Sequence, residues 1–327
     1  MKKVIIILLA LVLSISVMGG CGVSQKSQKI TLGAIPQDPR VEFYTIMVDG
    51  YNNGAKELGV DLTVQYSNND VQEETRLTEG YIAQGFSGII VNPIDSVAIQ
   101  GPLQKAKKAN IFMVLTDVEP EGDLGATSIV TSDNYSGGVA AGNMMKEMLK
   151  DGGEIIMTKF QFSSIAMDDR YQGFEDTIKD SNIKIVDTIS QDGTREDTLA
   201  KISPMLTKYP NLKGIFCSQG DPAIGVLAAV DAAGLSDKIV ILSYDVESEV
   251  AEAIKQGSAI KGGVTQFPYA MGVLAVRQIV KAIRGESYEK LIKLPVVPVT
   301  KDSVDLLQKD SVAFLKQYGN YDLSTKK

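Results

Sequence analysis

The chain has 327 residues, of which 44% are hydrophobic and 22% are charged, and its formal net charge is −7. This composition is typical of a globular protein with enough chain for two modest domains. An acidic chain without clustered Lys and Arg is a poor match for nucleic acid, and we interpret Lys107-Lys108 as solvated charge. The sequence contains no histidine, which excludes His-based metal sites and Ser-His or Cys-His catalytic pairs.

The first twenty residues have the pattern of an export signal. Lys2 and Lys3 precede the apolar run VIIILLALVL, which is too short to span a bilayer comfortably. The following SVMGGCG resembles a bacterial lipoprotein signal, which implies a signal peptide over 1–20, acylation of Cys21 and a lipidated linker over 21–28. An uncleaved anchor helix is the alternative. Either reading places the body of the protein outside the cytoplasm, tethered to the cell membrane at the periplasm or cell surface.

Strands and helices are predicted to alternate from residue 29 onward. The runs that read as strands cover 29–36, 60–67, 87–94, 111–118 and 126–133, and amphipathic helices connect them over 41–59, 70–85 and 96–110. The strands are apolar along most of their length, which is typical of a parallel sheet covered on both faces. Asp70 and Glu73 have the spacing of a capping box at the start of the second helix. This half predicts one doubly wound α/β unit.

The same alternation then restarts after residue 133. Helices are predicted over 134–152, 169–181, 194–210, 221–234 and 247–257, and strands over 153–160, 183–190, 213–219, 238–246 and 260–266. A long helix over 268–286, an extended segment over 291–300 and a polar tail follow. No flexible linker separates the halves, which indicates a hinge made of a few crossings. Cys217 reads as a small buried apolar residue, and no disulfide is expected because Cys21 is acylated. GGVAAG at 137–142 lacks dinucleotide-binding spacing, so no cofactor is expected.

Polar residues follow several predicted strands at the edge where doubly wound sheets bind ligands. They are Asp117, Gln219, Asp221, Asp245 and Gln266, while Arg170 follows a loop that contains Asp168 and Asp169. Carboxylates, amides and a guanidinium share directional hydrogen bonding. Phe43 and Tyr44 offer an apolar face for the C–H side of a sugar ring, although core packing explains one of the two equally well. Asp168 or Asp169 is expected to cap a helix. The mixture suits a polyhydroxylated ring.

Several stretches together resemble one family in their order along the chain. They include DGYNNGAKELG, VNPIDS, SDNYSGGVAAG, DDRYQGF and GVTQFPYAMG, and they are similar to type I periplasmic binding proteins of the ribose/galactose sugar-binding family. The resemblance implies an α/β fold with two doubly wound parallel-sheet lobes joined by three crossovers. The N-terminal lobe would comprise 29–133 plus 267–287, and the C-terminal lobe and tail 134–266 plus 288–327. Hinges are implied near Asp133-Asn134, near Gln266 and around 288–292.

The resemblance also implies roles for individual residues. Arg170 matches an arginine that grips ligand hydroxyls, Asp117 and Asp245 match carboxylates of the two lobes, Gln219 and Gln266 match amides near the hinge, and Phe43 and Tyr44 match an aromatic pair. Some positions depart from a ribose binder. Val118 stands where a ribose binder has an arginine, and Val41 stands where it has an asparagine, a loss for which Arg40 could compensate. Gly193-Thr194 stands where it has a stacking aromatic residue. Pro222 after Asp221 favours an unusual furanose.

The expected function is that of a solute-binding lipoprotein. It would capture a sugar or related small polar ligand between the lobes and deliver it, as a monomer without metal or cofactor, to the permease of an ABC importer. One alternative is a sensor that presents ligand to a chemoreceptor or histidine kinase, including a furanosyl quorum-signal receptor. Another is a glycosidase that uses Asp117 and Asp245 as paired carboxylates. Arg170 would hold both carboxylates ionised and so hinder a general acid, and we therefore expect no enzyme.

Overall fold

The computed structural model describes residues 29–122 and 125–325. The predicted signal peptide over 1–20, the lipidation site at Cys21 and the linker over 21–28 lie outside the described residues. Within the described part of the chain, no helix is both long enough and apolar enough to cross a membrane.

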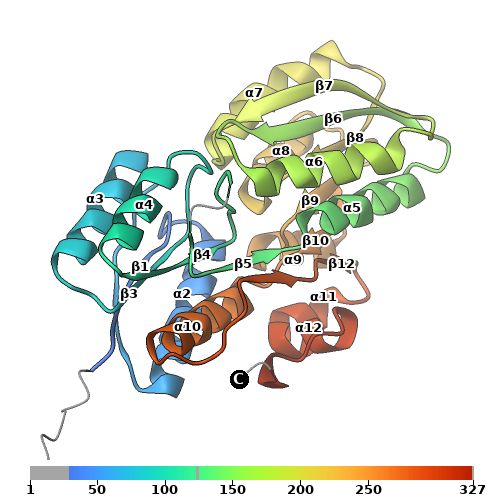
Figure 1. Ribbon diagram of the computed structural model, residues 1–327. Helices are drawn as coiled ribbons and strands as arrows, with labels where there is room; N and C mark the ends of the chain where they lie inside the picture. The colour runs from blue at the N-terminus through green and yellow to red at the C-terminus, as the bar shows by residue number, and fades with distance from the viewer. Residues whose placement is uncertain (1–28, 123–124, 326–327) are drawn as a thin grey trace, which may run out of the picture.

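The first lobe is built on a six-stranded parallel sheet with the strand order β11-β5-β4-β3-β1-β2. Its strands are β1 (Thr31–Ile35), β2 (Asp61–Val64), β3 (Gly88–Val91), β4 (Phe112–Thr116), β5 (Ser128–Ser132) and β11 (Leu291–Leu294). Helices α2 (Glu42–Leu58) and α10 (Pro268–Ile283) cover one face, and α3 (Val71–Ala83) and α4 (Gln100–Lys108) cover the other (Figure 1). Alternate strand residues enter the two cores, since Ala34 packs toward α2 and α10 whereas Ile35 packs toward α3 and α4.

The second lobe repeats this arrangement with the strand order β12-β10-β9-β8-β6-β7. Its strands are β6 (Gly153–Phe160), β7 (Ile183–Gln191), β8 (Leu212–Cys217), β9 (Val240–Tyr244), β10 (Ile260–Thr265) and β12 (Val297–Val299). One face carries α5 (Asn134–Met148) and α6 (Ile165–Ile178), and the other carries α7 (Arg195–Lys208), α8 (Gly220–Ala232) and α9 (Ser248–Gln256). Among the strands that the structure describes, only β12 runs antiparallel to its neighbour. The predicted class of two doubly wound parallel-sheet lobes is confirmed.

The chain passes between the two sheets three times. It leaves the first sheet after β5 at Asp133, returns after β10 at Gln266, and leaves again between β11 and β12 at Pro295. The third crossing differs from the expected position around 288–292, because residues 291–294 pair with β5 along the edge of the first sheet. We therefore propose that the third boundary between the lobes lies at Pro295 and not at 287/288.

Two local predictions about helix starts have different outcomes. Asp70 caps α3, since its carboxylate accepts hydrogen bonds from the backbone N–H groups of Gln72 and Glu73. The expectation that Asp168 or Asp169 caps a helix is wrong. Helix α6 begins at Ile165, and the hydroxyl of Ser164 accepts from the N–H of Met167 at 3.4 Å, so both aspartates lie inside the helix.

The segment expected to be a polar tail contains helices. They are α11 (Val304–Lys309), α12 (Ser311–Tyr318) and the short 3₁₀ turn η1 (Leu323–Thr325). Apolar residues recur at helical spacing, and Leu307, Phe314 and Leu315 are buried. Helix α11 packs on α9 of the second lobe, whereas Arg277 of α10 donates to the carbonyl oxygen of Leu323 at 2.9 Å. The C-terminal segment therefore contacts elements of both lobes.

Candidate functional site

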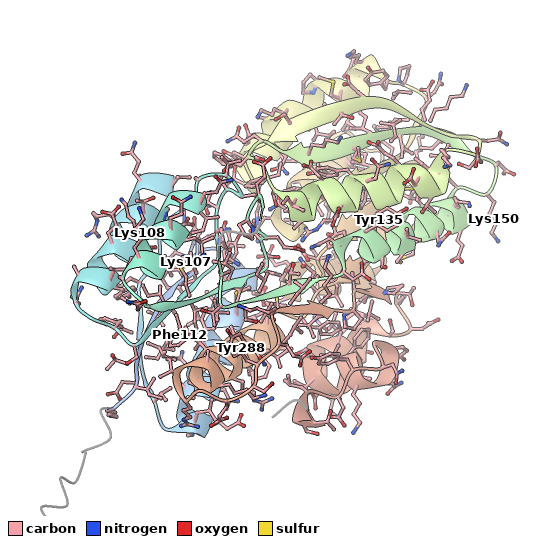
Figure 2. The ribbon with its side chains drawn as sticks, in the orientation of Figure 1. Lys107, Lys108, Phe112, Tyr135, Lys150 and Tyr288 are labelled. Carbon is pink, nitrogen blue, oxygen red and sulfur yellow. The ribbon has the colours of Figure 1, made fainter. Side chains whose placement is uncertain are left out.

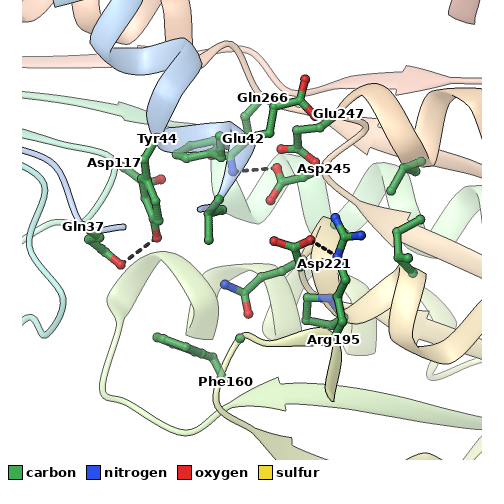
Figure 3. A pocket seen from close by; sticks show the side chains of 18 of the residues that line it. Gln37, Glu42, Tyr44, Asp117, Phe160, Arg195, Asp221, Asp245, Glu247 and Gln266 are labelled. Atoms are coloured by element: carbon green, nitrogen blue, oxygen red, sulfur yellow. Dashed lines mark hydrogen bonds and ion pairs between the residues drawn. The ribbon is translucent and has the colours of Figure 1, made fainter. Parts of the chain in front are cut away.

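One cavity lies between the lobes, and residues of both lobes line it (Figure 3). All eight residues predicted to bind ligand are among its lining residues. Phe43, Tyr44 and Asp117 come from the first lobe, Gln266 comes from the second crossing, and Arg170, Gln219, Asp221 and Asp245 come from the second lobe. Parallel strands of one sheet end at a common edge, and this brings residues far apart in the sequence to one place.

Arg170 projects from α6, and its side chain is 1% exposed. Its Nε donates to Oδ1 of Asn134 at 2.9 Å, and its Nη1 donates to the carbonyl oxygen of Ser218 at 3.0 Å. The guanidinium carbon lies 3.9 Å from the centroid of the Tyr244 ring, in the geometry of a cation–π contact. These contacts hold the planar guanidinium in one orientation at the cavity wall.

Asp117 and Asp245 occupy corresponding places in the two lobes. Asp117 follows β4 and Asp245 follows β9, each of which is the third strand of its sheet. Both aspartates have a left-handed backbone, with φ of 65° and 77°, a conformation that non-glycine residues adopt rarely and often at functional sites. Oδ1 of Asp245 accepts from Nε2 of Gln266 at 2.8 Å, and its Oδ2 lies 3.8 Å from Nη1 of Arg170.

Burial and the neighbouring guanidinium act in opposite directions on these acids. Burial raises the pKa of Asp245 to about 6, although Arg170 and the hydrogen bond from Gln266 lower it. Burial also raises the pKa of Asp117 against the influence of Arg170. For Arg170 itself, burial lowers the pKa, but Tyr244, Asp245 and Asp117 raise it above its ordinary value. The site therefore combines a buried guanidinium with two acids whose pKa values burial raises.

Two buried acceptors in the cavity wall have no hydrogen-bond partner within the described part of the chain. They are Oδ1 of Asp117 and Oε1 of Gln266, and the two side chains are 7% and 4% exposed. A buried acceptor without a donor is unfavourable by about 1–3 kcal/mol. A ligand that offers donors in the cavity would relieve this at both positions.

Aromatic rings from both lobes line the cavity. Phe43 and Tyr44 pack edge to face with their ring centroids 5.4 Å apart, and the Tyr44 hydroxyl donates to Oε1 of Gln37 at 2.6 Å. Sequence reasoning missed Phe160, which ends β6 and lines the cavity from the second lobe. A Cβ at Gly193 would lie 3.2 Å from the Phe160 ring. Gly193, where the resemblance implies an aromatic residue, thus lies next to the ring of Phe160.

Sequence reasoning also missed a charged cluster at the second-lobe side of the cavity. Arg195 bridges two acids, because its Nε lies 2.5 Å from Oδ1 of Asp221 and its Nη1 lies 2.6 Å from Oε2 of Glu249. Asp221 therefore faces the cavity as part of an ion pair. Arg40 pairs with Asp38, its side chain is 79% exposed and it is not among the lining residues, so it does not replace the asparagine implied at Val41.

The lobes also touch each other away from the crossings. The carboxylate of Glu42, at the start of α2, accepts hydrogen bonds from the backbone N–H of Ser248 at 3.1 Å and from its hydroxyl. Ser248 begins α9, so a first-lobe acid caps a second-lobe helix. In a second contact between the lobes, the N–H of Ser96 donates to the carbonyl oxygen of Ser163 at 3.2 Å. The lobes are thus joined by hydrogen bonds as well as by the three crossings.

The fold and the site define a two-lobed binding protein of the type I periplasmic class. The family model described as "Periplasmic binding protein domain" matches residues 32–287, and the chain belongs to this family. The ribose import binding protein of Escherichia coli (strain K12) is 25% identical over 297 residues, which cover 90% of this chain and 97% of that protein. The D-allose-binding periplasmic protein of the same organism is 28% identical over 278 residues, which cover 81% and 88%.

A solved structure extends the likeness from sequence to three dimensions. The ABC transporter periplasmic solute binding protein from Actinobacillus succinogenes with bound D-allose has a TM-score of 0.80 and 27% identity to this chain. The match covers 85% of this chain and 99% of that chain. The type I periplasmic resemblance predicted from the sequence is confirmed.

Proposed function

We propose that the protein captures a sugar or closely related small polar ligand between its lobes and delivers it to an ABC importer. The pair of buried acceptors without partners, Oδ1 of Asp117 and Oε1 of Gln266, carries this proposal, because hydroxyl groups of a ligand can donate to both. The relatives support the ligand class, since two of them are named as ribose- and D-allose-binding proteins and the solved structure holds bound D-allose.

Each of the eight predicted binding residues has a role in this proposal. Arg170 donates to ligand oxygens, Asp117 and Asp245 accept from hydroxyls, Gln219 and Gln266 contact the ligand near the crossings, Asp221 does so while paired with Arg195, and Phe43 and Tyr44 pack against the C–H face. Phe160 joins the aromatic set from the second lobe. Charge-assisted hydrogen bonds of this kind contribute about 1.5–3 kcal/mol each.

The ligand stabilises the closed arrangement, which the permease then recognises. A ligand that bridges the lobes favours the closed form only by its additional contacts in that form. The Glu42–Ser248 and Ser96–Ser163 contacts already join the lobes in this structure. The relatives are named as binding proteins, so the proposed activity is binding without turnover.

The test is a titration of the purified protein with pentoses, hexoses and inositols, followed by calorimetry and by thermal unfolding. We expect one compound to bind and to raise the melting temperature. Arg170→Lys should weaken that binding by about tenfold or more, because Lys keeps the charge but loses the planar fork. Arg76→Lys, at an exposed pair with Glu73, serves as the matched control. Absence of binding across the whole panel would contradict the proposal.

The site of action follows from the predicted signal. We propose that the protein acts as a monomer outside the cytoplasm, held at the membrane by lipid on Cys21. Metabolic labelling with palmitate should mark the natural chain, and Cys21→Ser should abolish the label and release the protein from the membrane fraction. Labelling that persists in Cys21→Ser would exclude this anchor.

A further inference from the structure

The charges that line the cavity are unbalanced. Seven carboxyl groups and two guanidinium groups line it. Five of the carboxyl groups come from the second lobe, namely Asp192, Asp221, Asp245, Glu247 and Glu249. Lysines lie elsewhere, since Lys107, Lys108 and Lys150 are exposed and project from the outer sides of α4 and the end of α5 (Figure 2).

Both guanidinium groups already have partners in the protein. Arg195 lies between Asp221 and Glu249, at 2.5 Å and 2.6 Å. Arg170 donates to Asn134 and to the carbonyl oxygen of Ser218, and it lies 3.8 Å from Asp245. Two cations therefore serve at least three carboxylates before any ligand enters.

Glu247 has acidic neighbours and lies close to the start of α8. A Cβ at Gly220 would lie 2.3 Å from Oε2 of Glu247, so the carboxyl occupies space that only glycine leaves open. Burial raises the pKa of Glu247 well above its ordinary value, and Asp245, Glu42 and Asp221 raise it further. Burial and the neighbouring acids thus make the ionised form of Glu247 less favourable, and a nearby cation would offset this.

The unsatisfied groups of the cavity also require a partner that donates hydrogen bonds, which an ammonium group does as hydroxyl groups do. Oδ1 of Asp117 and Oε1 of Gln266 are both acceptors, so the missing atoms are donors. An ammonium group offers three donors and no acceptor. A metal ion is a poorer match, because the described residues contain no group of three or more acids or cysteines placed to hold one. Figure 3 shows Asp245, Glu247 and Gln266 together on one side of the cavity, with Asp117 across from them beside Tyr44.

We propose that the ligand carries a protonated amino group, so that the protein takes an amino sugar or a similarly hydroxylated amine. The ammonium lies against Asp245 and Glu247, and hydroxyl groups of the same ligand reach Asp117. This inference rests on the proposed function and deepens it, because it names the chemical class within the hydroxylated ligands that the cavity takes.

Calorimetry on the purified protein with matched sugars tests the inference. The probes are D-glucosamine, D-galactosamine and D-mannosamine, each compared with its neutral parent hexose and its N-acetyl derivative. We expect one amine to bind at least about tenfold more tightly than both of its matched compounds, the difference that one charge-assisted contact provides. A neutral hexose that binds as tightly as its amine would overturn this inference and leave the proposed function intact. No binding by any of these compounds would contradict this inference, whereas the proposed function would be contradicted only if the pentoses and inositols also failed to bind.

Proton release gives a second readout that a neutral ligand does not produce. An ammonium bound beside Glu247 favours the ionised carboxyl, so a proton should be released on binding and the calorimetric enthalpy should change with the ionisation enthalpy of the buffer. In Glu247→Gln this proton should vanish and the preference for the amine should fall to about threefold or less. Glu79→Gln, at an exposed ion pair with Lys105, is the matched control and should retain both properties. An amine that binds without proton release would contradict the role of Glu247.

Discussion

In the first lobe, α2 and α10 cross so closely that a Cβ at Gly50 would lie 2.2 Å from the carbonyl oxygen of Tyr269. In the second lobe, α5 and α6 cross in the same way, and a Cβ at Gly138 would lie 2.2 Å from the carbonyl oxygen of Arg170. Each close pair contains the helix that directly follows a crossing between the sheets. The lobes therefore share a strand order and a glycine-dependent helix contact.

The difference lies in what this contact supports. In the first lobe, the facing residues Gly50 and Gly272 serve packing. In the second lobe, the same kind of contact positions the backbone of Arg170, whose side chain enters the cavity. The second lobe also supplies most of the charged groups of the cavity, whereas the first supplies the aromatic pair Phe43 and Tyr44. The two lobes thus have similar folds but contribute different kinds of side chain to the cavity.

The largest effect is expected at Arg170. Arg170→Ala leaves the buried Asp245 carboxylate without its guanidinium and removes one of the two donors to Oδ1 of Asn134, so the free energy of unfolding should fall by about 3–5 kcal/mol. Ligand affinity should fall by at least about a hundredfold, because charge-assisted contacts are lost. Chemical denaturation and calorimetry measure the two quantities. Normal ligand affinity in Arg170→Ala would contradict the conclusion that the second lobe supplies the main charged contact to the ligand.

Glu74 is a buried acid of the first lobe that does not line the cavity. Its Oε2 accepts from the N–H of Ile94 at 2.9 Å, and burial raises its pKa to about 8. The unfolded chain releases this proton near pH 4.5, so the stability of the folded state should fall as the pH rises from about 4.5 to 8. The slope is at most about 1.4 kcal/mol per pH unit.

Denaturation curves of Glu74→Gln between pH 5 and pH 8 measure this effect. The variant should show a shallower decline, since Asp245 also has a raised pKa, and it should exceed the natural protein by a few kcal/mol at pH 8, with unchanged ligand affinity. Glu73→Gln, on the same helix, pairs with Arg76 at the surface and should not reproduce this gain. Parallel pH curves for the natural protein and Glu74→Gln would show that Glu74 is not the titrating group.

Equivalent glycine substitutions compare the lobes directly. Gly138→Ala and Gly272→Ala should each lower the free energy of unfolding by about 1–3 kcal/mol, because a methyl group meets a backbone carbonyl oxygen. Only Gly138→Ala should also weaken ligand binding, since it displaces Arg170. Calorimetry on both variants under conditions where they remain folded tests this, and equal losses of affinity would contradict the assigned difference.

The smallest effect is expected at the contact between the lobes at the surface. Glu42→Ala removes the cap that the first lobe places on α9, and an exposed contact of this kind contributes roughly 1 kcal/mol or less. In Glu42→Ala, ligand release measured by stopped-flow fluorescence should become up to about fivefold faster. In Glu42→Gln, release should stay close to the natural rate, because the amide oxygen still accepts from Ser248. Identical release rates in all three proteins would show that this contact does not stabilise closure.

The strand ends explain why much of the site could be predicted. Asp117, Gln219, Asp245 and Gln266 each follow an apolar run that can form only a buried strand, and parallel strands end at one edge. Phe160 ends such a run as well, so the same rule applied to aromatic residues would have found it. Glu247 and Arg195 could not be found in this way, because the paths of their loops depend on neighbouring helices.

The sequence by itself determined that the protein has two α/β units with polar residues at the strand ends, because the hydrophobic pattern of strands and helices is a property of neighbouring residues. Tertiary structure alone decided the rest. The run LIKLPVVPVT is extended in either lobe, and only the available edges of β5 and β10 divide it into β11 and β12. Likewise, Glu247 acquires its altered pKa from acids brought together by folding, since electrostatic interaction depends on distance in space and on burial.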